Sequence, residues 1–324
     1  MRRRDFIKVI GGVTATWPVA AWAQQPSMPV VGVLASAAPF DPDNLSDFRK
    51  ALADAGYADG KTVAIEVRAA ERYDQLPAMA ADLVRRRVAV IVAAALPAAL
   101  AAKTATTAIP IVFNVGDDPV RAGVVARLNR PGGNLTGVTS LQAPLLLKRL
   151  GLLRELVRAD GVVGVLFNPE NPNTERRLAD LSEAARSVGQ RITVLNASHE
   201  EDFEGAFAAA VQQRVVALLI SDDLFFRSRT KHLAALAISH RLPTISIDRS
   251  FTAAGGLISY GVVAGQVYPQ IGAYVGRILK GEKPADLPIL QTTRFELVIN
   301  LKTAKALGLT MPFGLLNVAD EVIE

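Results

Sequence analysis

The stretch VAVIVAAALPAALAAKTATTAIPIVFN, residues 88–114, decides the fold class of this chain. Its two apolar, β-branched runs, 88–93 and 109–114, lack polar alternation, which is typical of parallel strands covered on both faces. A segment of helical period, 98–106, separates them, as a crossover between parallel strands requires. The stretch therefore predicts a strand–helix–strand unit of an open α/β sheet.

The same alternation continues on both sides of this unit. Strands are predicted at 30–34, 63–67, 162–167, 192–196, 215–221, 244–247 and 257–260, and the extended run 294–299 is interpreted as part of a further crossing of the hinge. Helices are predicted at 45–55, 76–87, 174–188, 201–213, 229–240 and 266–280, with one more starting near Pro119 behind the N-cap Asp118. The alternation restarts after residue 139, so the sequence predicts two doubly wound α/β lobes of similar size rather than one long sheet.

Residues 1–23 carry an export signature. Arg2, Arg3 and Arg4 precede the sequence DFIK, which matches the twin-arginine signal. An apolar run of about 14 residues follows, too short for the ~20 that cross a bilayer, and it ends in the small-x-small triplet of residues 21–23. We expect cleavage there and a protein free in the periplasm. The chain has no cysteine for a lipid anchor.

Charge and motifs exclude several function classes. Residues 1–23 hold four basic side chains and one acidic, so the rest of the chain has 32 basic and 30 acidic residues. No basic stripe with interleaved aromatics is present, and we expect no nucleic-acid partner. Arg176 and Arg177 fall on a predicted helix, where a solvated face is the ordinary interpretation. Only three histidines occur, without metal-ligand spacing, and no nucleophile elbow is found, so we expect no enzyme activity, no metal and no cofactor.

Small polar residues recur where the predicted strands end. In open α/β sheets ligands bind at the carboxyl ends of strands. The candidate ligand-binding residues there are Ser36, Asn114, Asp117, Asn168, Ser221, Asp222, Asp223 and Asp248, with Phe251 and Tyr260 as aromatic candidates. Each polar residue has an alternative role as a helix cap, and the aromatic residues have core packing as theirs. Together, facing across a hinge, they predict a polar cleft.

Several long strings resemble one family. They are YDQLPAMAADLVRR (73–86), IPIVFNVGDDPVRAGVVARLNRPGGNLTGV (109–138), FNPENPN (167–173), AAGGLISYG (253–261) and RILKGEKPADLPILQTTRFELVINLKTAKALGL (277–309). With them the chain resembles the ABC-transporter solute-binding proteins related to the tryptophan-binding component of streptococci. The resemblance implies the type I periplasmic-binding-protein fold with three hinge crossings. The implied lobes are 24–139 plus 262–287 and 140–261 plus 288–324.

The resemblance also implies a solute between the lobes and a monomer that works with ABC permease and ATPase subunits. It maps family positions onto Asp118, Asn168, Asp223 and Tyr260. The sequence departs from the family pattern at Ser250 and after Tyr260, beside the expected cleft, so the identity of the solute stays open among amino acids, ureas, carboxylates and aromatic breakdown products. Two other functions stay open as well: a sensor lobe for a membrane receptor, and a secreted hydrolase or isomerase on the same fold.

Overall fold

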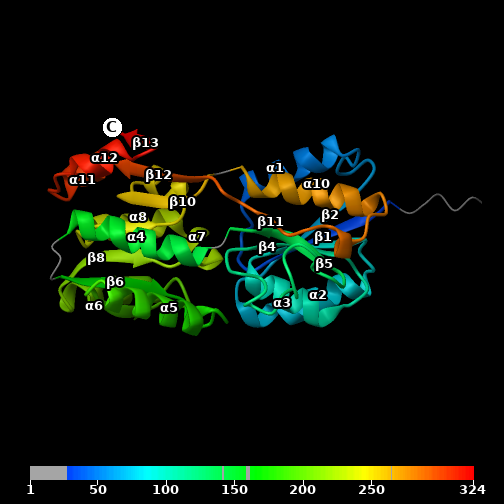
Figure 1. Cartoon of the computed structure of the whole chain (residues 1–324), viewed down its shortest axis with the longest axis horizontal. Coiled ribbons are helices and arrows are strands. Elements are labelled where there is room, and N and C mark those ends of the chain that lie inside the picture. The colour runs from blue at the N-terminus through cyan, green and yellow to red at the C-terminus, as the bar shows by residue number, and fades with distance from the viewer. Residues whose placement is uncertain (1–27, 141, 158–160, 264) are drawn as a thin grey trace, which may run out of the picture.

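The structure is a computed structural model that describes residues 28–140, 142–157, 161–263 and 265–324, and these form two α/β lobes placed end to end (Figure 1). The first lobe has a six-stranded sheet of order β11-β5-β4-β3-β1-β2, and the second has a seven-stranded sheet of order β13-β12-β10-β9-β8-β6-β7. The prediction of two doubly wound lobes is confirmed. The predicted signal, residues 1–23, lies outside the described residues.

The first lobe is a parallel sheet between two pairs of helices. Its strands are β1 (Val30–Ala35), β2 (Ala64–Ala69), β3 (Val90–Ala94), β4 (Ile111–Val115), β5 (Leu135–Thr139) and β11 (Leu290–Gln291), all paired in parallel. Its helices are α1 (Pro42–Asp54), α2 (Leu76–Arg85), α3 (Leu96–Ala105) and α10 (Val267–Leu279), with short 3-10 turns at Tyr73–Gln75 and Pro284–Asp286. One apolar core joins α2 and α3 to the sheet, and a second joins α1 and α10 to its other face.

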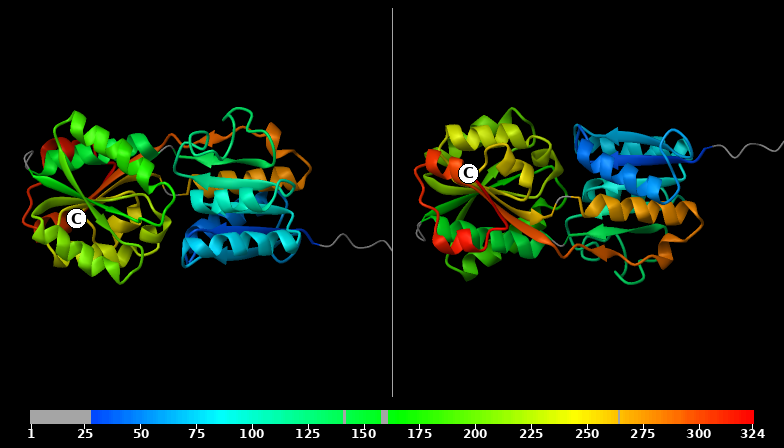
Figure 2. Two further views of the ribbon diagram at one scale, coloured as in Figure 1. Left: turned by 90° about the horizontal axis from the view of Figure 1, so that it is seen from below. Right: turned by 90° about the horizontal axis from the view of Figure 1, so that it is seen from above.

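The second lobe repeats this arrangement. Its strands are β6 (Val162–Phe167), β7 (Arg191–Asn196), β8 (Val215–Ile220), β9 (Thr244–Ser246), β10 (Ile258–Val262), β12 (Phe295–Asn300) and β13 (Glu321–Ile323), and β12 runs antiparallel to β10. Its helices are α4 (Gln142–Leu156), α5 (Thr174–Ser187), α6 (Asp202–Gln212), α7 (Leu224–Arg227), α8 (Thr230–Ser239), α9 (Arg249–Ala253), α11 (Leu301–Ala306) and α12 (Phe313–Asn317). Figure 2 shows helices on both sides of each sheet.

Three crossings connect the lobes, as predicted. They lie between β5 and α4, between β10 and α10, and between β11 and β12. One predicted boundary is wrong. Leu290 pairs with Val138 of β5, so β11 belongs to the first lobe, although the second lobe was predicted to resume at residue 288. A strand of two residues is too short to show the alternating pattern by which strands are recognised in a sequence.

The helix predicted near Pro119 is also absent. Asp118 Oδ1 accepts hydrogen bonds from the backbone N–H groups of Val120 and Arg121, as an N-cap does, but the chain then turns. The amides of Val124 and Val125 both bond to the carbonyl of Pro119, and Gly123 takes a φ of +70°, which ends the turn before a helix can propagate.

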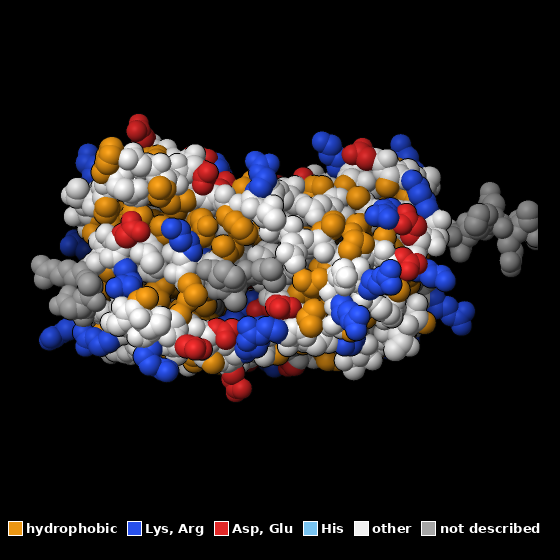
Figure 3. All heavy atoms as spheres, viewed as in Figure 1, with side chains coloured by type: hydrophobic (Ala, Val, Ile, Leu, Met, Phe, Trp, Pro, Cys, Tyr) orange, Lys and Arg blue, Asp and Glu red, His pale blue; other side chains and the backbone are white. Residues whose placement is uncertain are grey.

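Within the described residues, none of the helices has the length and apolar character needed to cross a membrane. On the face drawn in Figure 3, basic and acidic side chains are interspersed over both lobes.

Candidate functional site

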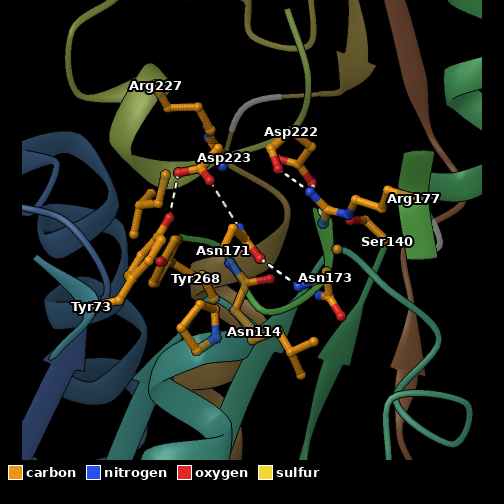
Figure 4. Close-up of a pocket in the computed structure, with 15 residues that line it drawn as sticks. Tyr73, Asn114, Ser140, Asn171, Asn173, Arg177, Asp222, Asp223, Arg227 and Tyr268 are labelled. Atoms are coloured by element: carbon orange, nitrogen blue, oxygen red, sulfur yellow. Dashed lines mark hydrogen bonds and ion pairs between the residues drawn. The ribbon is translucent and has the colours of Figure 1, made fainter. Parts of the chain in front are cut away.

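The carboxyl ends of the strands of both lobes meet at a cleft that has two adjacent parts. The first part, the inner chamber, has a volume of about 60 Å³, room for a few water molecules (Figure 4). Its lining residues come from both lobes: Tyr73, Ala95, Leu96, Pro97, Asn114, Gly116, Ser140, Asn171, Asn173, Arg177, Asp222, Asp223, Leu224, Arg227 and Tyr268.

The second part, the outer groove, has a volume of about 830 Å³ and lies between the β1–α1 loop of the first lobe and the α7–α9 region of the second. The first-lobe side of the groove has an apolar wall formed by Pro39, Phe40 and Pro42. Leu224 and Arg227 line both parts, so the two are adjacent.

Four of the predicted site residues line the cleft. Asn114 ends β4 and lies in the inner chamber, and Asp222 and Asp223 follow β8 into the same chamber. Asp248 follows β9 and lines the outer groove.

Asp117 connects the lobes instead of lining the inner chamber. Its side chain is 2% exposed, although it comes from the first lobe and its partners come from the second. Its Oδ1 accepts hydrogen bonds from Arg176 Nη2 at 2.8 Å and Arg177 Nε at 3.1 Å. Its Oδ2 accepts from Arg177 Nη2 and from Asn173 Nδ2, both at 2.7 Å.

The electrostatics of Asp117 follow from these contacts. Burial acts to raise the pKa of the Asp117 carboxyl, but the guanidinium groups of Arg177 and Arg176 outweigh it, so the pKa is lowered. Burial acts to lower the pKa of Arg177, and the carboxylates of Asp117 and Asp222 outweigh it, so that pKa is raised. Arg177 also donates to the backbone carbonyl of Asp222.

A second bridge between the lobes joins Tyr73 to Asp223. The Tyr73 hydroxyl donates to Asp223 Oδ1 at 2.5 Å, and Asn171 Nδ2 donates to Oδ2 at 2.9 Å (Figure 4). The backbone N–H of Phe225 donates to Oδ1 as well, at 2.8 Å. Burial raises the pKa of Asp223 despite these donors, and burial together with the charge of Asp223 raises the pKa of Tyr73 well above its usual value.

Two further arginines lie near the cleft in the second lobe. Arg227 pairs with Asp248 at 2.7 Å, and its charge outweighs the effect of burial on Asp248 and lowers the pKa of that carboxyl. Arg149 is fully buried, donates from Nε to the backbone carbonyl of Tyr260 at 2.7 Å, and has its pKa lowered to about 10 by burial.

Three of the remaining polar candidates make local structural contacts. The Ser36 hydroxyl donates to the carbonyl of Ala94 and accepts from the N–H of Ala98, which ties β1 to the first turn of α3. Asp118 caps the turn described above, and Asn168 Oδ1 accepts from the N–H of Glu170. None of the three lines the inner chamber or the outer groove.

Ser221 lines a third, smaller cavity of about 20 Å³ that it shares with Arg149 and Asp222. This cavity adjoins the inner chamber, with which it shares Arg177 and Asp222, and it holds too little volume for a solute.

The aromatic candidates belong to the packing of the second lobe. Phe251 is 1% exposed and lies in the apolar core with Phe203 and Phe207, so it does not reach the cleft. Gly256 leaves space for its ring, because a Cβ there would come within 2.2 Å of it. Tyr260 is half-buried, packs on the other core of the lobe and lies 6.4 Å from the Phe295 ring.

Several residues of the inner chamber were not predicted from sequence, notably Tyr73, Asn171, Asn173, Arg177 and Tyr268. The interpretation of Arg177 as solvated was wrong, because its side chain is 13% exposed and bonded to Asp117. A signal was available, since the sequence NPENPNTERR directly follows β6 at the carboxyl edge of the sheet.

Two doubly wound lobes with three crossings and a polar cleft between them define the class of type I periplasmic binding proteins. Within this class, the chain belongs to the family described as ABC transporter substrate binding protein, whose sequence profile matches residues 42–323. The family resemblance stated from the sequence is confirmed.

Individual proteins agree with this assignment. A tyrosine-binding protein of Clostridioides difficile is 27% identical over 265 residues, which are 81% of this chain and 75% of that protein. The crystal structure of a conserved domain protein from Vibrio cholerae is 27% identical with a TM-score of 0.81, covering 91% of this chain and 99% of the other. An ABC domain from Streptococcus pneumoniae in complex with L-Trp is 25% identical with a TM-score of 0.80, covering 92% and 100%.

Proposed function

We propose that this protein is the periplasmic component of an ABC importer that captures a small polar solute between its lobes and delivers it to a membrane permease. The observation that carries the proposal is a cleft whose lining is shared between lobes. Asn114 and Tyr268 come from the first lobe, and Asn171, Asp222 and Asp223 come from the second. Closure of the lobes over a solute would let both sets of groups bind it at once.

We propose an amino acid as the solute. The cleft holds acidic and basic groups together, Asp222 and Asp223 beside Arg177 and Arg227, which suits a ligand that carries both charges and no net charge. The inner chamber has room for a charged head group, and the outer groove has room for a bulky side chain against Phe40 and Pro39. The relatives described as binding tyrosine and L-Trp make aromatic amino acids the first to test.

The proposal also covers how the protein is exported and which membrane proteins it works with. The sequence of residues 2–8 supports export by the twin-arginine route to the periplasm, and the family supports partnership with permease and ATPase subunits. We propose that the protein is monomeric and performs no chemistry on its solute.

A ligand screen tests the proposal. The protein is purified after export and examined by thermal shift and isothermal titration with the twenty amino acids, ureas and aromatic carboxylates, while product formation is followed by mass spectrometry. We expect at least one amino acid to bind with micromolar affinity, about −8 kcal/mol, and to be recovered unchanged.

A matched pair of variants locates the binding. Asp222→Asn, in the inner chamber, should weaken binding about tenfold, since charge-assisted hydrogen bonds contribute about 1.5–3 kcal/mol. Asp54→Asn, the same change on the exposed face of α1, should have no effect. Turnover of a solute, or no amino acid bound, would contradict the proposal.

A further inference from the structure

Asp117 belongs to the first lobe, and its carboxylate is bound by side chains of the second lobe. Among the residues that the structure describes, four hydrogen bonds reach its two oxygens, and they come from Asn173, Arg176 and Arg177 at the start of α5 in the second lobe. Arg177 binds it with Nε and Nη2 together, the bidentate geometry that makes arginine–carboxylate pairs strong and specific. These bonds form only when the lobes are together.

We propose that these four residues form a clasp that holds the cleft closed before any solute has bound. The inference concerns the regulation of the proposed solute site, and it rests on the proposed function only in taking this cleft as that site. The clasp is a positioning device, because Asp117 does not line the inner chamber or the outer groove.

The strength of the clasp follows from its burial. Asp117 is 2% exposed and the side chain of Arg177 is 13% exposed, so water screens their attraction little. Another pair between the lobes, Arg121 with Asp180, is separated by 3.6 Å with side chains 57% and 34% exposed. Exposed pairs of that kind contribute little to stability. Of these two ion-pair contacts between the lobes, the clasp is therefore the one that favours the closed arrangement, beside the Tyr73–Asp223 hydrogen bond, and Arg121–Asp180 is its natural control.

The clasp can open because each of its bonds to Asp117 joins one lobe to the other. Asp117 follows β4 of the first lobe and its partners lie at the start of α5 of the second, so separating the lobes breaks these bonds while Arg177 keeps its contact with the Asp222 carbonyl within the second lobe. A solute can enter only when the clasp is open. Its association rate is therefore proportional to the fraction of the protein that is open.

The test measures the lobes directly, without solute. The chain contains no cysteine, so Glu71→Cys in the first lobe and Glu201→Cys in the second, both exposed, give two unique sites for nitroxide labels. The distance distribution between the labels reports the open and closed populations. It is recorded for the labelled protein, for Asp117→Asn, for Arg177→Lys and for the control Asp180→Asn.

We expect the labelled protein to be mainly closed and Asp180→Asn to match it. Asp117→Asn should shift the closed-to-open ratio toward open by about tenfold or more, since breaking one side of a buried pair has large effects. Arg177→Lys, which keeps the charge but loses the bidentate geometry, should shift it less.

A mainly open labelled protein, or an Asp117→Asn distribution equal to that of Asp180→Asn, would overturn the clasp. Circular dichroism and thermal unfolding of each variant confirm that the lobes are folded. Asp117→Asn changes the first lobe and Arg177→Lys changes the second, so a folding defect in one variant leaves the other to test the clasp. Because no solute is present, failure of the clasp is distinct from failure of the proposed function, which the ligand screen decides.

Discussion

Replacing Tyr73 by Phe removes one hydroxyl from the second bridge between the lobes and leaves the aromatic ring in place. In the closed arrangement this hydroxyl donates to Asp223 Oδ1 at 2.5 Å, and Asn171 and the Phe225 amide, both within the second lobe, remain as donors. The variant therefore weakens closure without disturbing either lobe. A hydrogen bond to a charged group contributes about 1.5–3 kcal/mol.

The expected effect is kinetic. Release of a solute from a closed cleft requires opening, and about 1.5–3 kcal/mol corresponds to a rate about 10 to 150 times higher. Association should also accelerate, because the open form of the free protein becomes more populated. The dissociation constant should change less than either rate, since both rates rise together.

Stopped-flow fluorescence with the solute found in the screen measures both rates at neutral pH. Tyr57→Phe, at a half-buried tyrosine of the first lobe outside the inner chamber, is the matched control. A dissociation rate for Tyr73→Phe within about twofold of the unmodified protein would refute the reasoning, because that is less than the smallest expected effect of losing a charge-assisted hydrogen bond.

Three further predictions concern packing and pH. Phe251→Ala should lower the free energy of unfolding by about 3–5 kcal/mol, measured by denaturant titration, while the folded protein keeps its solute affinity, because this ring fills the core and not the cleft. Gly261→Ala should lower the melting temperature through a loss of about 1–3 kcal/mol, because a Cβ there would lie 1.8 Å from the Ile247 carbonyl oxygen; an unchanged melting temperature would contradict the close packing. The pKa of Asp117 is lowered in the closed protein, so its contribution is present above the usual carboxyl pKa near 4 and is lost as the pH falls through the lowered value. The label distances should thus show opening in acid that Asp117→Asn, already open, does not repeat.

The strands and the edge that carries the site could be predicted from sequence because each depends on a local pattern. The runs at β3 and β4 are apolar throughout, as strands covered on both faces are, and the structure places them in the centre of the first sheet. Once the strands are known, topology puts Asn114 and Asp222 at the carboxyl edge, where both are found.

The partners across the cleft could not be predicted because they depend on how the lobes are placed. Arg177 is 60 residues from Asp117 in sequence, and Tyr73 is 150 residues from Asp223. On a helix considered alone, a pair of arginines is most simply explained as a solvated face. Burial by the opposite lobe changes that interpretation, and no pattern within α5 reports it.

The choice between helix cap and site residue, which the sequence left open for every polar candidate, depends on how many hydrogen bonds a side chain can make. Ser36 has a single hydroxyl, whose one proton goes to the Ala94 carbonyl and whose oxygen accepts from the Ala98 amide, both within the first lobe, so it has no proton left to donate across the cleft. A carboxylate has two oxygens with about four acceptor positions. Asp223 accordingly caps α7 through the Phe225 amide and still bonds to Tyr73 across the cleft.

Asp248 follows the same rule. Its Oδ1 caps α9 through the Ser250 amide, while Oδ2 accepts from Arg227 at the edge of the outer groove. Capping is thus a competing role for a hydroxyl but a compatible one for a carboxylate. For strand-end residues of an open α/β lobe, an aspartate that caps the next helix should remain a candidate for the cleft, whereas a serine in the same position is accounted for by its cap.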